Sequence, residues 1–256
     1  EMLEEVIVQS LAQFGDSESW FEQRAMAAPI LADIAYYRGG WPAVEVWAGE
    51  WRAWAAKRGV TYMQTLLPAL AARYALLAGE LERADELLAP FQGQDVAHFC
   101  LRWREREAMS AALSLHALAR NRYDAARAQA QRIQAEARAQ GRLRGVITAH
   151  ILLACIMEAQ GDRNGAETEM LCAIRAAHPD GYVMPFTEAG FTARHILERL
   201  LADPSAMPMD SQHIELAIRS FSLQPSHNPH DLSLREIEIM RHLSDGISNK
   251  LIARRM

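Results

Sequence analysis

The sequence has few cysteines, and none of them forms a metal-binding or redox motif. Its three cysteines are Cys100, Cys155 and Cys172, and no C-x-x-C spacing occurs among them. Isolated cysteines of this kind give neither a disulfide framework nor a zinc ligand set. The sequence therefore predicts a reduced, cytoplasmic environment for the chain.

Long apolar runs are missing as well. The most apolar segment, residues 146–159, is interrupted by Thr148 and His150. It is also shorter than the run of about 20 residues that a helix needs to span a membrane. Residues 1–5 lack the positive charge that opens a signal peptide. We expect no membrane contact, and a chain that starts within a helix, as a fragment of a longer protein would.

Positive charge is not in excess, because 27 Lys and Arg stand against 32 Asp and Glu, and the net charge is −5. Broad nucleic-acid binding needs clustered Lys and Arg, so we expect any nucleic-acid contact to be local. The sequence also contains no Gly-x-x-x-x-Gly-Lys-Ser/Thr loop, which is the phosphate-binding signature of many ATPases. We expect no cofactor in this chain.

Sets of catalytic side chains are absent too. The nine histidines are scattered singly, and two of them, His227 and His230, lie in a Pro-containing segment that resembles a tether. No Ser-His-Asp or Cys-His set can be assembled from the spacing of the residues. The sequence therefore predicts no enzyme activity.

What the sequence does contain is a junction that recurs about every 40 residues. Its copies begin at Gly39, Gly79, Asn121 and Gly161, which are 40, 42 and 40 residues apart. Eight residues before each copy stands a packing residue, and the residue after it is always small. The packing residues are Leu31, Ala71, Leu113 and Leu153, and the small ones are Ala32, Ala72, Ser114 and Ala154. Such a period predicts an all-α fold in which each helical hairpin buries its apolar face against its neighbours.

The junctions and the positions around them resemble tetratricopeptide repeats, lengthened from the usual period of about 34 residues to about 40. The resemblance implies a right-handed superhelix of helical hairpins, which we expect over residues 1–202. The sequence departs from the family pattern at two places. The position four residues before the junction is mostly Ala instead of a large residue, and Arg163 stands where an aromatic residue is expected. A generic array of helical hairpins is the alternative.

The register of the repeat indicates which residues face the inside of the array. These positions are mostly apolar, with sparse polar groups, and this mixture is typical of a small-molecule or helix-binding groove. The residues that we expect to line an effector groove are Asp33, Tyr36, Tyr37, Arg73 and Glu158. The alternative is that Asp33, Arg73 and Glu158 pair between neighbouring hairpins.

Two further stretches each allow two interpretations. Trp47, Trp51 and Trp54 form a stripe that either stacks on a ligand or packs against the next hairpin. The segment 127–144, with Arg122 nearby, is rich in arginine and holds a single glutamate, Glu136. It is either an acidic-partner or nucleic-acid surface, or a solvated face.

Residues 232–256, which follow an extra helix and linker expected at 203–231, have a different pattern. Ser233 and Glu236 form a capping box at the start of a helix. Asp245 and Gly246 then separate this helix from a second short one that begins near Ser248. Two short helices at a tight turn are the first half of a DNA-binding helix-turn-helix unit.

This C-terminal segment resembles the start of a LuxR-type DNA-binding domain. The matching residues are Leu232, Arg235, Glu236, Glu238, Leu243, Gly246, Ser248, Asn249, Lys250, Ile252 and Ala253. The resemblance implies that Ser248, Asn249 and Lys250 contact DNA phosphates from a helix N-terminus. Leu251 replaces the usual Glu of the family, and the sequence ends at Met256, before the recognition helix.

Tetratricopeptide-like hairpins followed by a LuxR-type segment resemble the large ATP-dependent LuxR-family transcriptional regulators of the maltose-activator type. Residues 186–190 also resemble the close of the sensor region in that family. The resemblance implies a small-molecule inducer or a regulatory protein in the repeat groove, DNA bound by the complete C-terminal domain, and a possible homo-oligomer. It also implies an upstream ATPase domain with ATP as its cofactor, which this chain does not include. The alternative function is a protein-protein interaction scaffold without a small-molecule ligand.

Overall fold

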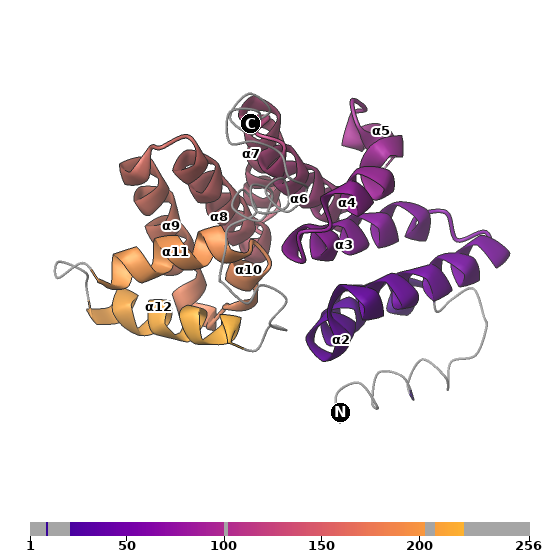
Figure 1. Ribbon diagram of the computed structural model, residues 1–256, viewed down its shortest axis with the longest axis horizontal. Helices are drawn as coiled ribbons and strands as arrows, with labels where there is room; N and C mark the ends of the chain where they lie inside the picture. Colours follow the sequence, from indigo (N-terminus) through magenta and orange to yellow (C-terminus); the bar gives the residue numbers. More distant parts are fainter. Residues whose placement is uncertain (1–8, 10–20, 100–101, 203–207, 223–256) are drawn as a thin grey trace, which may run out of the picture.

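The computed structural model describes residues 9, 21–99, 102–202 and 208–222, and every regular element in this part of the chain is a helix (Figure 1). The all-α prediction is confirmed for these residues. The longer helices are α2 (Phe21–Lys57), α3 (Met63–Leu77), α4 (Leu81–Leu88), α6 (Trp103–Ala119), α7 (Tyr123–Ala139), α8 (Leu143–Ala159), α9 (Arg163–Ala177), α11 (Phe191–Leu201) and α12 (Pro208–Phe221). The short ones are η2 (Ala89–Phe91), α5 (Val96–Phe99), η3 (His178–Asp180) and α10 (Met184–Thr187).

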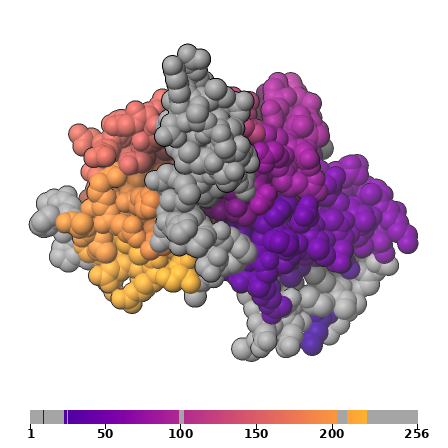
Figure 2. Space-filling view, in the orientation of Figure 1, coloured from indigo at the N-terminus to yellow at the C-terminus, as the bar shows by residue number. Residues whose placement is uncertain are grey.

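The helices pack mainly against their neighbours in the sequence. The most extensive contacts join α2 to α3, α3 to α4 and α6, α6 to α7, α7 to α8, and α8 to α9. Consequently α2 to α4 lie at one end of the molecule, and α11 and α12 lie at the other (Figure 2). None of the described helices combines the length and the apolar character that crossing a bilayer requires.

Three of the four predicted junctions are helix corners with one residue in a left-handed conformation. These residues are Gly79, Asn121 and Gly161, with φ of +75°, +56° and +83°. At each corner the next residue donates its N–H to the carbonyl five positions earlier. The N–O distances are 2.8 Å for Glu80 to Ala75, 2.7 Å for Arg122 to Ala117 and 3.0 Å for Asp162 to Met157. This is the Schellman hydrogen bond, which satisfies a carbonyl that the helix end leaves unpaired.

The same bond occurs in the connections that follow the first hairpin (the two halves of α2), the third (α6 and α7) and the fourth (α8 and α9). Gly59, Gly141 and Gly181 have φ between +64° and +67°. The bonds run from Val60 to Ala55 at 3.0 Å, from Arg142 to Ala137 at 2.8 Å and from Tyr182 to Ala177 at 3.1 Å. The corner chemistry therefore repeats both within hairpins and between them.

The first junction bends at Gly40, so the predicted position, Gly39, is wrong by one residue. Gly40 has φ +65° and ψ −157° and breaks the helical path of α2. Only glycine adopts this backbone region readily. Gly39 remains helical, but a Cβ there would lie 2.8 Å from the Cβ of Ala43. Glycine is therefore required at position 40 by the backbone conformation and favoured at position 39 by the closeness of Ala43.

The repeat register correctly predicts the packing positions. Ala32, Ala72, Ser114 and Ala154 are completely buried or nearly so, and the packing residues before them are at most 9% exposed. Ser114 is tolerated because its hydroxyl donates to the carbonyl of Ala126 on α7, at 2.9 Å. Small side chains at these points let successive helices approach closely.

The tryptophan stripe packs on the core, and arginines of the basic segment form ion pairs and hydrogen bonds with neighbouring elements. The rings of Trp47 and Trp51 lie 5.4 Å apart, and those of Trp51 and Trp54 lie 6.4 Å apart, over the core between α2 and α3. Arginines of the basic stretch contact neighbouring elements. Their partners are Gln160 for Arg127, Asp95 for Arg132, Glu107 for Arg142 and Glu188 for Arg144.

The predicted C-terminal helix-turn-helix, with Ser248, Asn249 and Lys250, lies outside the described residues. Of the segment 203–231, the structure describes α12 and Ser222.

Candidate functional site

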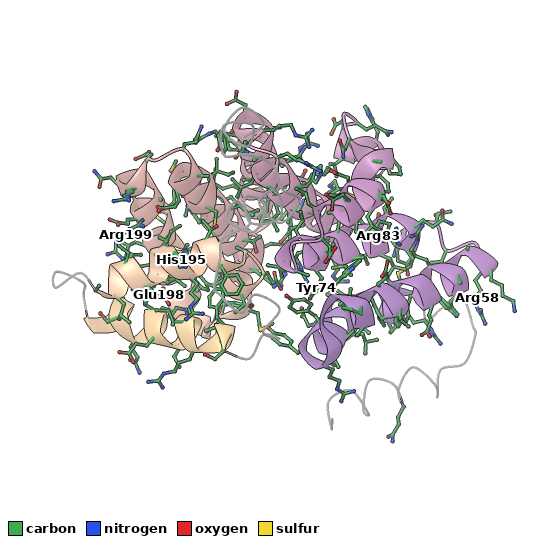
Figure 3. The ribbon with its side chains drawn as sticks, viewed as in Figure 1. Arg58, Tyr74, Arg83, His195, Glu198 and Arg199 are labelled. Atoms are coloured by element: carbon green, nitrogen blue, oxygen red, sulfur yellow. The ribbon has the colours of Figure 1, made fainter. Side chains whose placement is uncertain are left out.

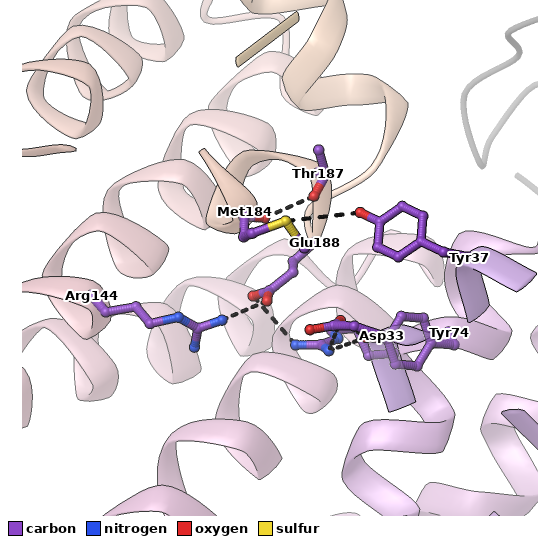
Figure 4. A network of polar contacts seen from close by, with 8 residues as sticks. Asp33, Tyr37, Tyr74, Arg144, Met184, Thr187 and Glu188 are labelled. Atoms are coloured by element: carbon purple, nitrogen blue, oxygen red, sulfur yellow. Dashed lines mark hydrogen bonds and ion pairs between the residues drawn. The ribbon is translucent and has the colours of Figure 1, made fainter. Parts of the chain in front are cut away.

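Arg73 on α3 lies at the centre of a partly buried charge network. Figure 4 shows its partners Asp33, Tyr74 and Glu188. Its guanidinium is 3.5 Å from the carboxylate of Asp33 on α2 and 3.3 Å from that of Glu188, which follows α10. It also donates a 2.7 Å hydrogen bond to the hydroxyl of Tyr74, which in turn donates to Asp33. The Arg73 side chain is only 12% exposed. One cation therefore joins three segments that are distant in the sequence.

Glu188 contacts a second arginine, Arg144 on α8, and its carboxylate lies between the two guanidinium groups (Figure 4). Its side chain is 10% exposed. The residues just before it are held as well, because the Tyr37 hydroxyl lies 4.0 Å from the sulfur of Met184. Residues 184–188 are thus tied to α2 and α3 on one side and to α8 on the other.

The balance of burial and charge keeps Arg73 ionised. Burial lowers the pKa of the Arg73 guanidinium, but Glu188, Tyr74 and Asp33 raise it by more, so the net pKa is raised. For Asp33, burial raises the pKa of the carboxyl, and Arg73 opposes this only in part. Burial also raises the pKa of the Tyr74 and Tyr37 hydroxyls. The tyrosines therefore act as neutral hydrogen-bonding groups at physiological pH.

A cavity of about 390 Å³ adjoins this network. Its wall comes from α2, α3, α6, α8 and the segment around α10. The lining residues are Pro29, Leu66, Leu70, Arg73, Trp103, Arg104, Glu107, Ala108, Ala111, Arg142, Leu143, Arg144, Gly145, Thr148, Tyr182 and Glu188. This volume and this mixture of apolar and charged groups fall within the usual range of small-molecule sites.

One side of the cavity is built where α6 and α8 approach closely. Glu107 pairs with Arg142, and burial raises the pKa of the Glu107 carboxyl. A Cβ at Gly145 would lie 2.7 Å from a carboxylate oxygen of Glu107 and 2.8 Å from the Cβ of Ala137. Glycine at this helical position thus makes room for the carboxylate.

Trp103 lies beside this ion pair. The guanidinium of Arg142 lies 4.7 Å from the centre of the Trp103 ring, and that of Arg104 lies 4.9 Å from it. These are cation–π distances. The ring and the two guanidinium groups therefore form one polar and aromatic patch on the wall.

The structure separates the five predicted groove residues. Asp33, Tyr37 and Arg73 meet in the charge network. Tyr36 is 3% exposed and packs its ring 4.8 Å from that of Tyr74, and burial raises its pKa to about 12. Tyr36 therefore belongs to the core, although its register position predicted the groove.

Glu158 lies elsewhere. Its two carboxylate oxygens accept from Arg199 on α11, at 2.9 Å and 2.7 Å. Figure 3 shows Arg199 on the side of α9 and α11, away from Tyr74 beside α2 and α3. Asp33, Arg73 and Glu158 thus all pair between packed elements, as the alternative interpretation holds.

Several residues of the site were not among the predicted ones. Glu188, Arg144, Glu107 and Trp103 all line the cavity. Glu188 lies beyond the fourth hairpin, where the repeat register gives no position. In the described part of the chain, no three His, Cys, Asp or Glu side chains are grouped in a way that could hold a metal ion.

Comparison with known proteins adds one finding. Residues 9–203 match the family model described as the MalT-like TPR region, where TPR stands for tetratricopeptide repeat. No curated protein and no solved structure matches the chain.

Proposed function

The chain belongs to the family of MalT-like TPR regions, and we propose that it is the effector-sensing region of a bacterial LuxR-type transcriptional regulator. In this proposal a small effector binds in the cavity beside Arg73. Binding is coupled to DNA binding by the C-terminal segment, residues 232–256, and so to the control of transcription. The chain itself catalyses no reaction.

The observation that supports this proposal best is the composition of the cavity wall. The wall includes Pro29 on α2, Glu188 beyond the fourth hairpin, and residues of α3, α6 and α8. A ligand in this cavity touches elements from both ends of the repeat array. A ligand that prefers one arrangement of these elements shifts the population toward it. The cavity is therefore well placed to convert occupancy into a rearrangement.

The contacts of α10 suggest how such a rearrangement would reach the C-terminal segment. α10 packs against α12. His213 on α12 has its Nε2 atom 3.0 Å from the carbonyl oxygen of Tyr182, and its ring lies 6.1 Å from that of Phe186. The sequence after α12 leads to the residues that resemble the LuxR-type domain. A shift of residues 182–188 would therefore change the contacts of α12, the last described helix.

The partners follow from the same proposal. DNA phosphates would be contacted by Ser248, Asn249 and Lys250 once the recognition helix is present. ATP would belong to an upstream ATPase domain. Homo-oligomerisation would bring several DNA-binding domains together on one promoter.

The proposal is tested with the full-length protein that contains this chain. DNA fragments that it binds are selected from genomic DNA, and a metabolite library is screened for compounds that raise its melting temperature. We expect a hit to change the affinity for the selected DNA at fixed salt. An effector that binds but leaves DNA affinity unchanged contradicts the proposed coupling.

The DNA-contacting role has a matched control, because the sequence contains only two lysines, Lys250 and Lys57. Charge reversal by Lys250→Glu should weaken DNA binding about tenfold or more, because it replaces a phosphate contact with repulsion. Lys57→Glu, at an exposed position in the last turn of α2, should leave DNA binding unchanged. Equal DNA affinity of Lys250→Glu and the wild type would count against the DNA role.

A protein-protein interaction scaffold is the second candidate, because Trp103 is 40% exposed at the cavity wall and aromatic residues of this kind often anchor protein partners. The same screen distinguishes the two functions. No small-molecule hit, together with a bound protein partner that is lost in Trp103→Ala, would favour the scaffold.

A further inference from the structure

The cavity wall is richer in cationic than in anionic groups. It holds four arginines, Arg73, Arg104, Arg142 and Arg144, against two glutamates, Glu107 and Glu188. Arg144 is 47% exposed, and within the described part of the chain Glu188 is the one carboxylate at ion-pair distance from it. Arginine carries five N–H donors, so Arg144 retains donors for a further acceptor.

Two polar atoms of the wall are buried donors that no described residue satisfies. They are Nε of Arg73 and Oγ1 of Thr148, and both residues line the cavity. A buried donor without an acceptor costs free energy. A hydrogen-bond acceptor, such as a carboxylate oxygen, would satisfy either of them.

Glu188 indicates the type of anion that suits this wall. Its carboxylate bridges Arg73 on α3 and Arg144 on α8, so a carboxylate is already accommodated by these two guanidinium groups (Figure 4). The remaining wall is apolar or aromatic, with Leu66, Leu70 and Trp103. A doubly charged phosphate fits less well, because Glu107 also lines the cavity and Asp33 lies behind Arg73.

We propose that the effector cavity binds a small organic carboxylate with an apolar or aromatic body, and that its carboxylate competes with Glu188 for Arg73 and Arg144. This inference rests on the proposed function, because it names the effector class of the same site. Competition would release residues 182–188 from α3 and α8. The released segment is the one that contacts α12.

Binding is tested by isothermal titration calorimetry on the full chain, with 4-phenylbutyrate as the probe and neutral 4-phenylbutanol as its matched control at constant ionic strength. We expect saturable binding of the carboxylate with a dissociation constant of the order of 1 mM or lower, as ligand efficiency permits for a molecule of this size. The alcohol should bind about tenfold more weakly or worse, because it lacks the charge-assisted hydrogen bonds. Equal affinities, or no binding of the carboxylate, overturn the proposal.

The role of Arg144 in binding the carboxylate is tested with a matched pair of variants. Arg144→Gln should weaken 4-phenylbutyrate binding about tenfold or more. Arg83→Gln should leave it unchanged. Arg83 is 42% exposed and also pairs with glutamate, but it lies on α4 and outside the cavity wall. An Arg144→Gln chain that binds as tightly as the wild type overturns the proposal.

Competition is tested separately with Glu188→Gln. This variant keeps the size of the side chain and removes its charge, so we expect 4-phenylbutyrate to bind several-fold more tightly. Binding weaker than that of the wild type, in a chain with an unchanged helical circular dichroism spectrum, overturns the competition. If Glu188→Gln does not fold, we measure exchange of the 182–188 amides in the wild type. Acceleration by 4-phenylbutyrate supports competition, and no change overturns it.

Failure of this inference differs from failure of the proposed function. If carboxylates bind through Arg144 but leave the DNA affinity of the full-length protein unchanged, the ligand class stands and the regulatory function fails. If only neutral compounds bind and they do change DNA affinity, the function stands and the ligand class fails.

Discussion

Gly161 adopts a φ of +83°, and apart from its neighbours in the chain no described atom lies within 4 Å of the position that a Cβ would take there. Its role is therefore conformational and not steric. A side chain in the left-handed region costs about 1 kcal/mol or slightly more. We expect Gly161→Ala to lower the free energy of unfolding by about 1 kcal/mol, measured by urea denaturation followed by circular dichroism.

Gly49 provides the control for this prediction. It lies exposed in the second half of α2 at a helical φ, and it also has nothing within 4 Å of a Cβ. Because alanine favours a helix interior over glycine, Gly49→Ala should raise the free energy of unfolding by about 0.5 to 1 kcal/mol. Equal effects of the two variants would contradict the conformational explanation.

Single residues also mark where sequence analysis reaches its limit. The spacing correctly predicted the corner residues Gly79, Asn121 and Gly161, because a left-handed residue leaves a local signature of Gly or Asn. It misplaced the first bend, because Gly39 and Gly40 are both glycine and local chemistry does not distinguish them. Tyr36 was predicted at the groove, but a ring as large as this one is placed by whichever neighbour it packs on, here Tyr74.

At the scale of elements, His116 joins α4, α6 and α7. It lies on α6 with only 2% of its side chain exposed. Its Nε2 contacts the carboxylate of Asp85 on α4, which Arg120 also contacts. Arg122, just before α7, donates to Nδ1 at 3.1 Å. Since Nδ1 accepts this bond, the ring is neutral and carries its proton on Nε2.

This arrangement predicts a pH dependence of stability. Burial, together with the nearby charges of Arg122 and Arg120, lowers the pKa of His116 by more than Asp85 raises it, so the folded pKa lies below the ordinary value of about 6.5. As pH falls through about 6.5, the unfolded chain binds a proton that the folded chain does not, and the free energy of unfolding decreases. The stabilisation is thus present above this pH and is lost on acidification.

The measurement compares wild type and His116→Gln by urea denaturation between about pH 7.5 and pH 5.5. Glutamine keeps an N–H donor for Asp85 but does not titrate. We expect the wild type to lose more stability over this range than the variant. His213, whose pKa burial also lowers, contributes equally to both proteins. Parallel pH profiles would rule out His116 as the source.

At the scale of the whole molecule, the core has two large clusters that both draw on α8. One includes Leu152, Leu153 and Ile156 with residues of α2, α3, α4, α6 and α7, and the other includes Ile147, Ile151 and Cys155 with residues of α9 to α12. Arrays that contact mainly sequence neighbours often open in parts. The two ends should therefore respond separately to local damage.

Two truncations test this independence by amide hydrogen exchange. Phe186, fully buried in the second cluster, and Leu88, fully buried beside α3 and α6, belong to different core clusters. Each change to Ala should cost about 2 to 5 kcal/mol. We expect Phe186→Ala to speed exchange in α10 to α12 and not in α3 and α4, and Leu88→Ala to do the reverse. Uniform acceleration by either variant would show a single cooperative unit.

The site shows why local pattern did not identify all of its residues. Asp33, Tyr37 and Arg73 follow from the repeat register, because neighbouring hairpins stack in a regular way. Glu188 does not, since its partners are set by how the chain returns after the fourth hairpin. The contact between Tyr37 and Met184, 147 positions apart, is of the same kind. Contacts of this span depend on the accumulated geometry of every hairpin between them.

In an array of helical repeats each unit contacts mainly its neighbours, so in general one unit can be added or removed without changing the contacts of distant ones. Here that freedom is limited. Asp33, Tyr37 and Arg73 on α2 and α3 meet Met184 and Glu188, which lie beyond the fourth hairpin. Inserting one more hairpin would move these partners apart and would open the cavity between them. These contacts between the two parts of the array therefore fix the number of hairpins between them. We expect proteins descended from this chain to keep that number while their surface residues diverge.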